Sequence, residues 1–369
     1  MTATKFKIER NELLICLQRV MGAVEKRNTM PALAHVLCEV DANRLAVTGT
    51  DLEIMLRTRS DQGNGDTFST LLPGRKLLDI CKSLADGAAI TLTKEDGRVT
   101  VASGRSRFSL ACLSAVDFPI LETSSEAVAV TLATKEFSAV LAHTAFAMAN
   151  QDVRYYLNGL LIKVEPALLT VVATDGHRLS INQIDGQFDV GEAHQVIVPR
   201  KGVLELQKLL PELSEEVTLQ LTPQHVRVES PTIEFTSKLI DARFPDYERV
   251  IPIDLPHRLT VEKKLLKDAL QRVSILSNER YRGVRLALCD NQAKLEANNT
   301  EQEQAEETLL VDYQGESMEV GFNVHYLLDV LNVVEADEVI IDLKDPSSSI
   351  LVSDPAAKGS RYVIMPMRL

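Results

Sequence analysis

The sequence lacks the markers of several protein classes. No run in its 369 residues approaches the ~20 apolar residues of a membrane-spanning helix, and the start, MTATKFKIER, has no apolar core segment of a signal peptide. The 45% hydrophobic fraction suits a folded globular chain. Cysteines are few, odd in number and without CxxC spacing, which predicts reduced thiols of a cytosolic protein and no zinc site. They are Cys16, Cys38, Cys81, Cys112 and Cys289.

Sequence motifs of enzymes are also missing. There is no HExxH, no second histidine at metal spacing and no glycine-rich loop for a phosphate, and no Ser or Cys stands out as a nucleophile. Asp175 and His177 in VVATDGHRL could form a general-base pair, so an enzyme or a nucleotide-binding protein remains an alternative. A turn at Asp175 and Gly176, with His177 and Arg178 hydrogen-bonded locally, explains the same residues and is favoured. We therefore expect no catalytic residue, no metal and no cofactor.

What the sequence does contain is an internal repeat. Four features recur at intervals of 124 to 129 residues. The first two are helical stripes starting at Ile8, Leu132 and Val261, and the pairs Thr50-Asp51, Thr174-Asp175 and Asn298-Asn299. The other two are second helices that superpose at Leu78, Leu204 and Leu328, and aromatic residues in strand-like runs at Phe108, Phe235 and Tyr362. A single match at helical spacing means little, but four in register indicate a triplication.

Each repeat predicts an α+β domain of about 120 residues, a usual domain size, with two helices against antiparallel sheet. We expect domains at 1–127, 128–253 and 254–369. In the first repeat the pattern predicts a helix whose stripe starts at Ile8 and which ends near 21–22, a second helix over 74–84 and a flexible tip, QGNGD, at 62–66. Its strands are predicted at 34–40, 45–48, 52–58, 89–93, 99–102 and 105–113.

Charge is distributed unevenly. The net charge of -12 argues against nucleic acid, because non-specific DNA binding depends on Lys and Arg neutralising phosphates. The helix candidates are nonetheless basic, as in GRKLLDICKSL, RKGVLELQKLL and KKLLKDALQRV, while acid accumulates at 301–307 and 335–338. These basic side chains could simply be solvated on the protein surface. If the repeats place the helices on one side, the same side chains would form a continuous basic surface that binds a polyanion.

Six motifs, spread in order along the chain, carry a resemblance to a known family. They are VRYYLNG at 153–159, VATDGHRL at 172–179, VPRKGV at 198–203, FTSKLIDARFPDY at 235–247, FNVHYLLDVL at 322–331 and YVIMPMRL at 362–369. Together they look like the bacterial β sliding clamp, the processivity subunit of DNA polymerase III. The resemblance implies a non-enzymatic head-to-tail homodimer whose six domains close a ring around duplex DNA without sequence preference. A protein scaffold that never encircles DNA is a further alternative.

The resemblance also implies site residues. DNA contacts would come from Arg27, Gln151, Arg75, Lys201 and Tyr155. The dimer interface would join Lys76, Arg105, Phe108 and Leu110 to Arg272, Ile275, Leu276, Glu301 and Glu303 of the other copy. A groove would bind peptides of the polymerase III alpha subunit, the clamp loader and other proteins with a clamp-binding motif, and no membrane is expected as a partner. The groove residues would be Leu157, Thr174, Gly176, His177, Arg178, Leu179, Pro245, Arg249, Val250, Asn323, Tyr326, Ser349, Val363, Met365, Pro366, Met367 and Arg368.

Overall fold

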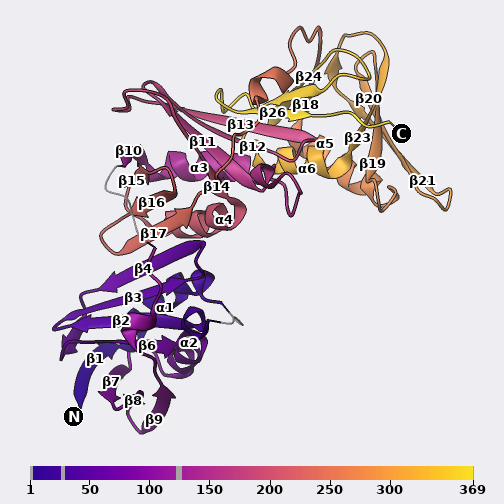
Figure 1. Cartoon of the computed structure of the whole chain (residues 1–369). Coiled ribbons are helices and arrows are strands. Elements are labelled where there is room, and N and C mark those ends of the chain that lie inside the picture. Colours follow the sequence, from indigo (N-terminus) through magenta and orange to yellow (C-terminus); the bar gives the residue numbers. More distant parts are fainter. Residues whose placement is uncertain (1–2, 26–29, 122–126, 369) are drawn as a thin grey trace. The chain divides into compact units, whose positions relative to one another are not determined.

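The computed structural model describes residues 3–25, 30–121 and 127–368 of the chain. Its elements fall into two compact units, residues 1–135 with 204–239 and residues 136–203 with 240–369 (Figure 1). The chain passes between the units within helices α3 (Thr134–Ala145) and α4 (Arg200–Leu209) and after residue 239. Among the residues described, no helix is long and apolar enough to span a membrane.

Two antiparallel sheets form the first unit. One has, in order across the sheet, β5 (Gly63–Gly65), β1 (Thr4–Glu9), β7 (Ala89–Glu95), β8 (Arg98–Ser103) and β9 (Ser106–Ala111). The other has β10 (Val128–Ala133), β15 (Glu216–Leu221), β16 (His225–Glu229), β17 (Ile233–Lys238), β4 (Ile54–Ser60), β3 (Arg44–Thr50), β2 (His35–Asp41) and β6 (Phe68–Pro73). The second sheet therefore joins strands of the first and second repeats.

Helices cover these sheets with the faces that their sequence patterns predict. Helix α1 (Arg10–Val20) buries Leu13, Leu17 and Val20 on one stripe, and α2 (Gly74–Ser83) packs against it. The predicted start of the first helix at Ile8 was wrong, because Ile8 lies in β1 and pairs with Ile90 of β7.

Two further antiparallel sheets form the second unit. One has β14 (His194–Pro199), β11 (Gly159–Glu165), β12 (Leu168–Thr174), β13 (Arg178–Asp185), β26 (Arg361–Ile364), β25 (Ile350–Ser353), β24 (Glu338–Leu343), β18 (His257–Glu262) and β22 (Asp312–Tyr313). The other has β21 (Gln304–Leu310), β20 (Gln292–Asn298), β19 (Gly283–Cys289) and β23 (Met318–Asn323). Helices α5 (Lys263–Ser274) and α6 (Val324–Val333) pack against each other beside them.

The triplication is visible in the turns that precede equivalent strands. Asp51 Oδ1 accepts hydrogen bonds from the backbone N–H groups of residues 53 and 54, both at 2.8 Å. Asp175 Oδ1 accepts from residues 177 and 178 at 2.9 and 3.0 Å, and Asn299 Oδ1 accepts from residues 301 and 303 at 3.0 Å. The three pairs that recur in the sequence therefore make the same kind of turn, ahead of β4, β13 and β21.

Two details of the first repeat differ from the sequence expectation. The tip at 62–66 contains strand β5, which pairs with β1, and this is possible because Gly63 lies against the Phe6 ring, where a Cβ would come within 2.0 Å of Cζ. The strand expected from Leu52 begins only at Ile54, because Leu52 has a φ of 76° within the turn.

Candidate functional site

A groove of about 250 Å³ lies in the second unit, where β13 of the second repeat pairs with β26 of the third. Leu157, Leu179 and Val363 are buried beneath it, and Val250 and Met365 stand at its rim with 42% and 38% of their surface exposed. Its full lining is Arg154, Tyr156, Leu157, Thr174, Gly176, Arg178, Leu179, Pro245, Asp246, Tyr247, Val250, Val363 and Met365. The groove is thus an apolar socket with charged side chains at its edge, typical of sites for short ligands.

The turn between β12 and β13 forms one wall of the groove. Thr174 Oγ1 accepts from Gly176 N at 3.0 Å and donates to the Arg178 carbonyl at 2.6 Å. Gly176 has a φ of 89°, and a Cβ there would lie 2.8 Å from Nη1 of Arg154. Glycine therefore serves both the backbone conformation and the close approach of Arg154.

Arg154 is held across this turn by two acceptors. Its Nη2 donates to Asp152 Oδ2 at 2.9 Å and to the Asp175 carbonyl at 3.1 Å. The hydrogen bonds from Arg154 lower the pKa of Asp152 to about 2, so this carboxylate stays charged at neutral pH. The rim consequently presents a guanidinium in a fixed place.

The structure brings nine of the predicted groove residues together in the cavity lining: Leu157, Thr174, Gly176, Arg178, Leu179, Pro245, Val250, Val363 and Met365. It adds four that sequence reasoning missed: Arg154, Tyr156, Asp246 and Tyr247. All four stand inside the quoted motifs VRYYLNG and FTSKLIDARFPDY, so the signal was present in the sequence. The use of all of them in binding remains a prediction.

The other predicted groove residues lie outside this cavity. His177 stacks on Tyr326 with ring centroids 6.3 Å apart, Asn323 caps α6, and Arg249 pairs with Asp246 at 2.7 Å. Ser349 is half-buried just before β25. The C-terminal segment with Pro366, Met367 and Arg368 leads away from the cavity, since Met365 N donates to His177 O at 2.9 Å and Met367 N to Gly321 O at 2.8 Å.

The geometry gives no support to an enzyme at Asp175 and His177. Oδ1 of Asp175 accepts the N–H groups of residues 177 and 178, and Oδ2 accepts from Arg178 Nε at 3.1 Å. The carboxylate thus stabilises the turn and binds Arg178, which agrees with the prediction that these residues form a locally hydrogen-bonded turn. Within the described chain, the His177 ring has no hydrogen bond to Asp175. The described residues likewise contain no group of three or more His, Cys, Asp or Glu that could hold a metal ion.

The five cysteines form no disulfide in the structure. Cys16, Cys38 and Cys81 are buried in the first unit, and Cys289 is exposed. Burial raises the pKa of Cys38 and of Cys81 to about 12, which keeps these thiols protonated and unreactive.

The predicted DNA contacts are spread over several elements. Arg75 is exposed on α2, and Lys201 is half-exposed on α4. Gln151, with a φ of 58°, and Tyr155, 58% exposed, share a loop closed by hydrogen bonds between Asp152 and Asn158. Arg27 lies outside the described residues.

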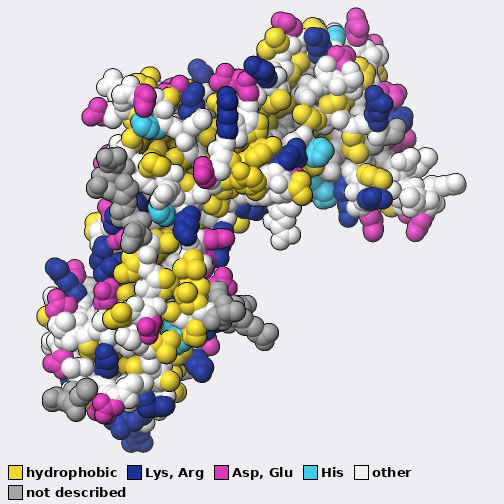
Figure 2. Space-filling model, viewed as in Figure 1, with side chains coloured by type: hydrophobic (Ala, Val, Ile, Leu, Met, Phe, Trp, Pro, Cys, Tyr) yellow, Lys and Arg dark blue, Asp and Glu magenta, His cyan; other side chains and the backbone are white. Residues whose placement is uncertain are grey.

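The basic character of the helices is weaker than their sequences suggest. Lys264 pairs with Asp268 at 2.8 Å, Lys208 with Glu205 at 2.6 Å and Arg272 with Glu307 at 2.5 Å. Figure 2 shows side chains of both signs interspersed on the face in view. Arg75 and Lys76 are exposed without an ion-pair partner in the described part of the chain. Net attraction for a polyanion would therefore depend on a few cations.

The predicted interface residues lie at or near two open sheet edges. Arg105, Phe108 and Leu110 belong to β9 or precede it, and β9 is the last strand of its sheet, with β8 as its neighbour. Lys76 is exposed on α2. In the second unit β21 is likewise an edge strand, preceded by Glu301 and Glu303. Helix α5 contacts β21 through Arg272, and Ile275 just after it is 76% exposed, with Leu276 half-buried.

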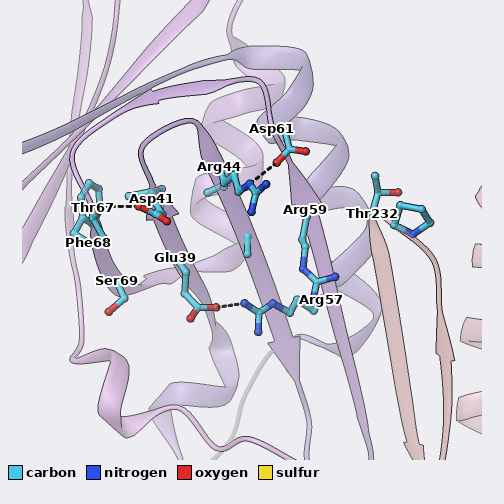
Figure 3. A pocket seen from close by; sticks show the side chains of 14 residues that line it. Glu39, Asp41, Arg44, Arg57, Arg59, Asp61, Thr67, Phe68, Ser69 and Thr232 are labelled. Carbon is cyan, nitrogen blue, oxygen red and sulfur yellow. Dashed lines mark hydrogen bonds and ion pairs between the residues drawn. The ribbon is translucent and has the colours of Figure 1, made fainter. Parts of the chain in front are cut away.

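A larger hollow, about 750 Å³, lies on the first unit over β2, β3, β4 and β6 (Figure 3). It opens above Ala46, a small residue between long charged side chains. Its arginines each have a carboxylate partner: Arg57 with Glu39 (3.0 Å), Arg44 with Asp61 (3.2 Å) and Arg59 with Glu234 (2.9 Å). Because these charges balance, the hollow offers no excess positive charge to nucleic acid.

The fold consists of three repeated α+β domains that share sheets across their junctions, and the described residues contain no cluster of catalytic side chains. This arrangement is typical of the class of DNA clamps. Models of the DNA polymerase III beta subunit match the chain along its length, the N-terminal domain at residues 4–122, the central domain at 131–246 and the C-terminal domain at 248–368. The chain belongs to the DNA polymerase III beta subunit family, the beta sliding clamps. It is a DNA sliding clamp of the polymerase, and has no catalysis of its own.

Individual relatives agree over the full length. The beta sliding clamps of Pseudomonas aeruginosa and Escherichia coli (strain K12) are 46% and 45% identical, with 99% of this chain and 100% of each relative covered. The crystal structure of the Pseudomonas aeruginosa subunit has a TM-score of 0.96 at 46% identity, covering 99% of this chain and 100% of that one. The Bartonella birtlesii clamp bound to griselimycin has a TM-score of 0.96 at 34% identity, with both chains covered completely.

Proposed function

We propose that the chain forms a head-to-tail homodimer that closes as a ring around duplex DNA, built from domains at 1–127, 128–253 and 254–369. The main support for the dimer is a strand whose outer edge has no partner strand within the described chain. In the second and third repeats the last strand pairs with the preceding repeat, β17 with β4 and β26 with β13. The last strand of the first repeat, β9, has an open edge, and the equivalent of β4 and β13 in the third repeat is β21, also at an edge. Pairing β9 of one protomer with β21 of its partner repeats the internal joint and closes by rotation.

The two edges suit each other in charge. The β9 edge carries Arg105 and Arg107, both exposed, whereas Glu301 and Glu303 precede β21 and Glu306 lies in it. Opposite charges on two surfaces favour the correct pairing over pairing of like edges. Leu310, 78% exposed, and Ile275 add apolar area on the β21 side. Pairing would also cover strand edges that otherwise risk aggregation.

The groove in the second unit would bind short linear peptides of the polymerase III alpha subunit, the clamp loader and other proteins with a clamp-binding motif. Leu, Val, Pro and Met side chains make an apolar socket, and the flexible Met365 at its rim can adapt to different side chains. Griselimycin is bound in the solved clamps of Pseudomonas aeruginosa and Bartonella birtlesii, which supports a ligand-binding surface on this chain as well.

DNA would be held by topology more than by tight contacts. Gln151, Tyr155, Arg75, Lys201 and Arg27 would touch the duplex backbone without sequence preference, so the ring could slide. A ring on replicating DNA works in the bacterial cytoplasm, and tethering the polymerase to it raises the effective polymerase concentration at the primer end.

Sedimentation velocity of the purified chain tests the dimer. We expect a species of twice the 40.8 kDa chain mass at micromolar concentration. A monomer at all accessible concentrations would rule out the joint between β9 and β21 as a stable contact.

A further inference from the structure

Arg178 lines the groove, yet its side chain is only 12% exposed. Its guanidinium has an acceptor in each direction: Nε donates to Asp175 Oδ2 at 3.1 Å, Nη2 to the Phe146 carbonyl at 2.8 Å and Nη1 to Asp329 Oδ2 at 2.5 Å. The rings of Phe146 and Tyr326 lie 5.2 and 4.7 Å from its central carbon. A guanidinium so far removed from water depends on these partners.

The partners come from three places in the chain. Asp175 belongs to the turn that Arg178 itself completes, and Phe146 directly follows α3. Asp329 comes from α6 in the third repeat, 151 residues away from Arg178 in the sequence. Asp329 has 39% of its side chain exposed and takes no part in the groove lining. In the described part of the chain, the hydrogen bond that connects Asp329 to the groove lining is the one to Arg178.

We propose that Asp329 is a positioning residue for the peptide groove, holding Arg178 so that the turn at 174–179 keeps its binding shape. This inference rests on the proposed peptide-binding function of the groove. A residue of the third repeat would therefore fix the conformation of a groove wall formed by residues of the second repeat.

The hydrogen bonds of the turn explain how Asp329 reaches the binding surface. Asp175 Oδ1 already accepts two backbone N–H groups of the turn, so only Oδ2 remains for Arg178. Without Asp329, Nη1 would lose its acceptor inside a nearly closed site, and the guanidinium would have to move toward water or pull on Asp175. Either movement displaces Leu179, which follows Arg178 in the chain, and Thr174, which donates to the Arg178 carbonyl.

Fluorescence anisotropy with a labelled peptide carrying the clamp-binding motif of the polymerase III alpha subunit tests the proposal on the full-length protein. Asp329→Ala should raise the Kd about tenfold, the size of one lost charge-assisted hydrogen bond. Asp329→Glu, which keeps the charge, should restore most of the affinity, and Asp329→Asn should lie between. In an Arg178→Ala background Asp329→Ala should add nothing, because its effect passes through Arg178.

Asp268→Ala is the matched control, since Asp268 also lies on a helix, is 38% exposed and pairs with Lys264. The Kd of this variant for the peptide should equal that of the unmodified chain.

Met365→Ser tests whether the groove itself binds the peptide. If Met365→Ser weakens binding and Asp329→Ala does not, the positioning role is wrong while the peptide groove stands. If neither variant matters, the groove is not the peptide site. A full Asp329→Ala effect in the Arg178→Ala background would also overturn the proposal. Asp329→Asn, with its nearly identical shape, provides the test if Asp329→Ala does not fold.

Discussion

Phe235 of β17 lies directly opposite Leu56 of β4, in a sheet that joins the second repeat to the first. Tyr362 of β26 lies opposite Ser180 of β13 in the same way, joining the third repeat to the second. Phe108 is the equivalent aromatic residue of the first repeat, and its strand β9 has a partner on one side, Val101 of β8. The chain thus builds the same joint twice, and we propose that β9 and β21, each the last strand of its sheet, form a third joint between two protomers.

Substitutions beside β21 should separate the protomers. Ile275→Lys and Leu276→Lys each place an ammonium group at the proposed joint, where an unpaired charge is costly to bury. We expect monomers in sedimentation velocity for both variants. Ile253→Lys is the matched control for Ile275, because the two isoleucines are 74% and 76% exposed, and it should remain dimeric. Dimers of unchanged stability for Ile275→Lys and Leu276→Lys would place the interface elsewhere.

Charge reversal should show whether the two edges face each other. Arg105→Glu should raise the dimer dissociation constant about tenfold at low salt and less at high salt, since exposed ion pairs are screened. Reversal of Glu301 and Glu303 to Arg on the same chain should recover much of the loss. An additive loss in the combined variant, measured by sedimentation equilibrium, would mean that these charges do not meet.

The groove should depend on its apolar rim. Met365→Ser removes a side chain that a bound peptide would cover, and we expect the Kd for the polymerase peptide to rise about tenfold. Leu265→Ser, on α5, changes an apolar residue with the same 38% exposure outside the groove. Calorimetric titration of both variants should show a loss for Met365→Ser alone, and equal losses would point to a general effect on folding.

Thiol reactivity should follow burial. Cys38 and Cys81 have a pKa of about 12, so almost none of either thiol is ionised at pH 8, and the thiolate is the reactive form. With an aromatic disulfide reagent the native chain should show a fast phase from the exposed Cys289, which Cys289→Ser removes. Raising the pH from 7 to 9 should leave Cys38 and Cys81 protected. Rapid labelling of either, located by mass spectrometry, would show that the first unit opens easily.

The repeat period predicted the order of elements well, because local patterns determine helices and turns. The stripe with Leu13, Leu17 and Val20 and the turn at Asp175 were predicted from the sequence. At Asp51 and Asn299 the sequence showed the recurring pairs but not the turns that they make. The strand at Gly63–Gly65 was not, because its pairing with β1 depends on Phe6, far away in the chain.

The candidate groove was predicted in part, by resemblance. Its lining residues Arg154 and Tyr247 were not expected, although both lie in the matching motifs. Asp329 stands in the motif FNVHYLLDVL, but its contact with Arg178 could not be found from the sequence, since the two residues are 151 positions apart and neither spacing nor composition links them. Such pairs depend on how two repeats pack, which local sequence does not determine.

The most direct test of the account is retention on DNA of different topology. The protein would be loaded with a clamp loader and ATP onto nicked circular duplex, and half of the sample would be cut with a restriction enzyme before gel filtration at physiological salt. An encircling ring should stay on the circle and leave the linear DNA by sliding off its ends. Equal retention on both forms would contradict encirclement and indicate ordinary electrostatic or specific binding. Retention on neither, with a loader shown to work on this chain, would favour a protein scaffold that never encloses DNA.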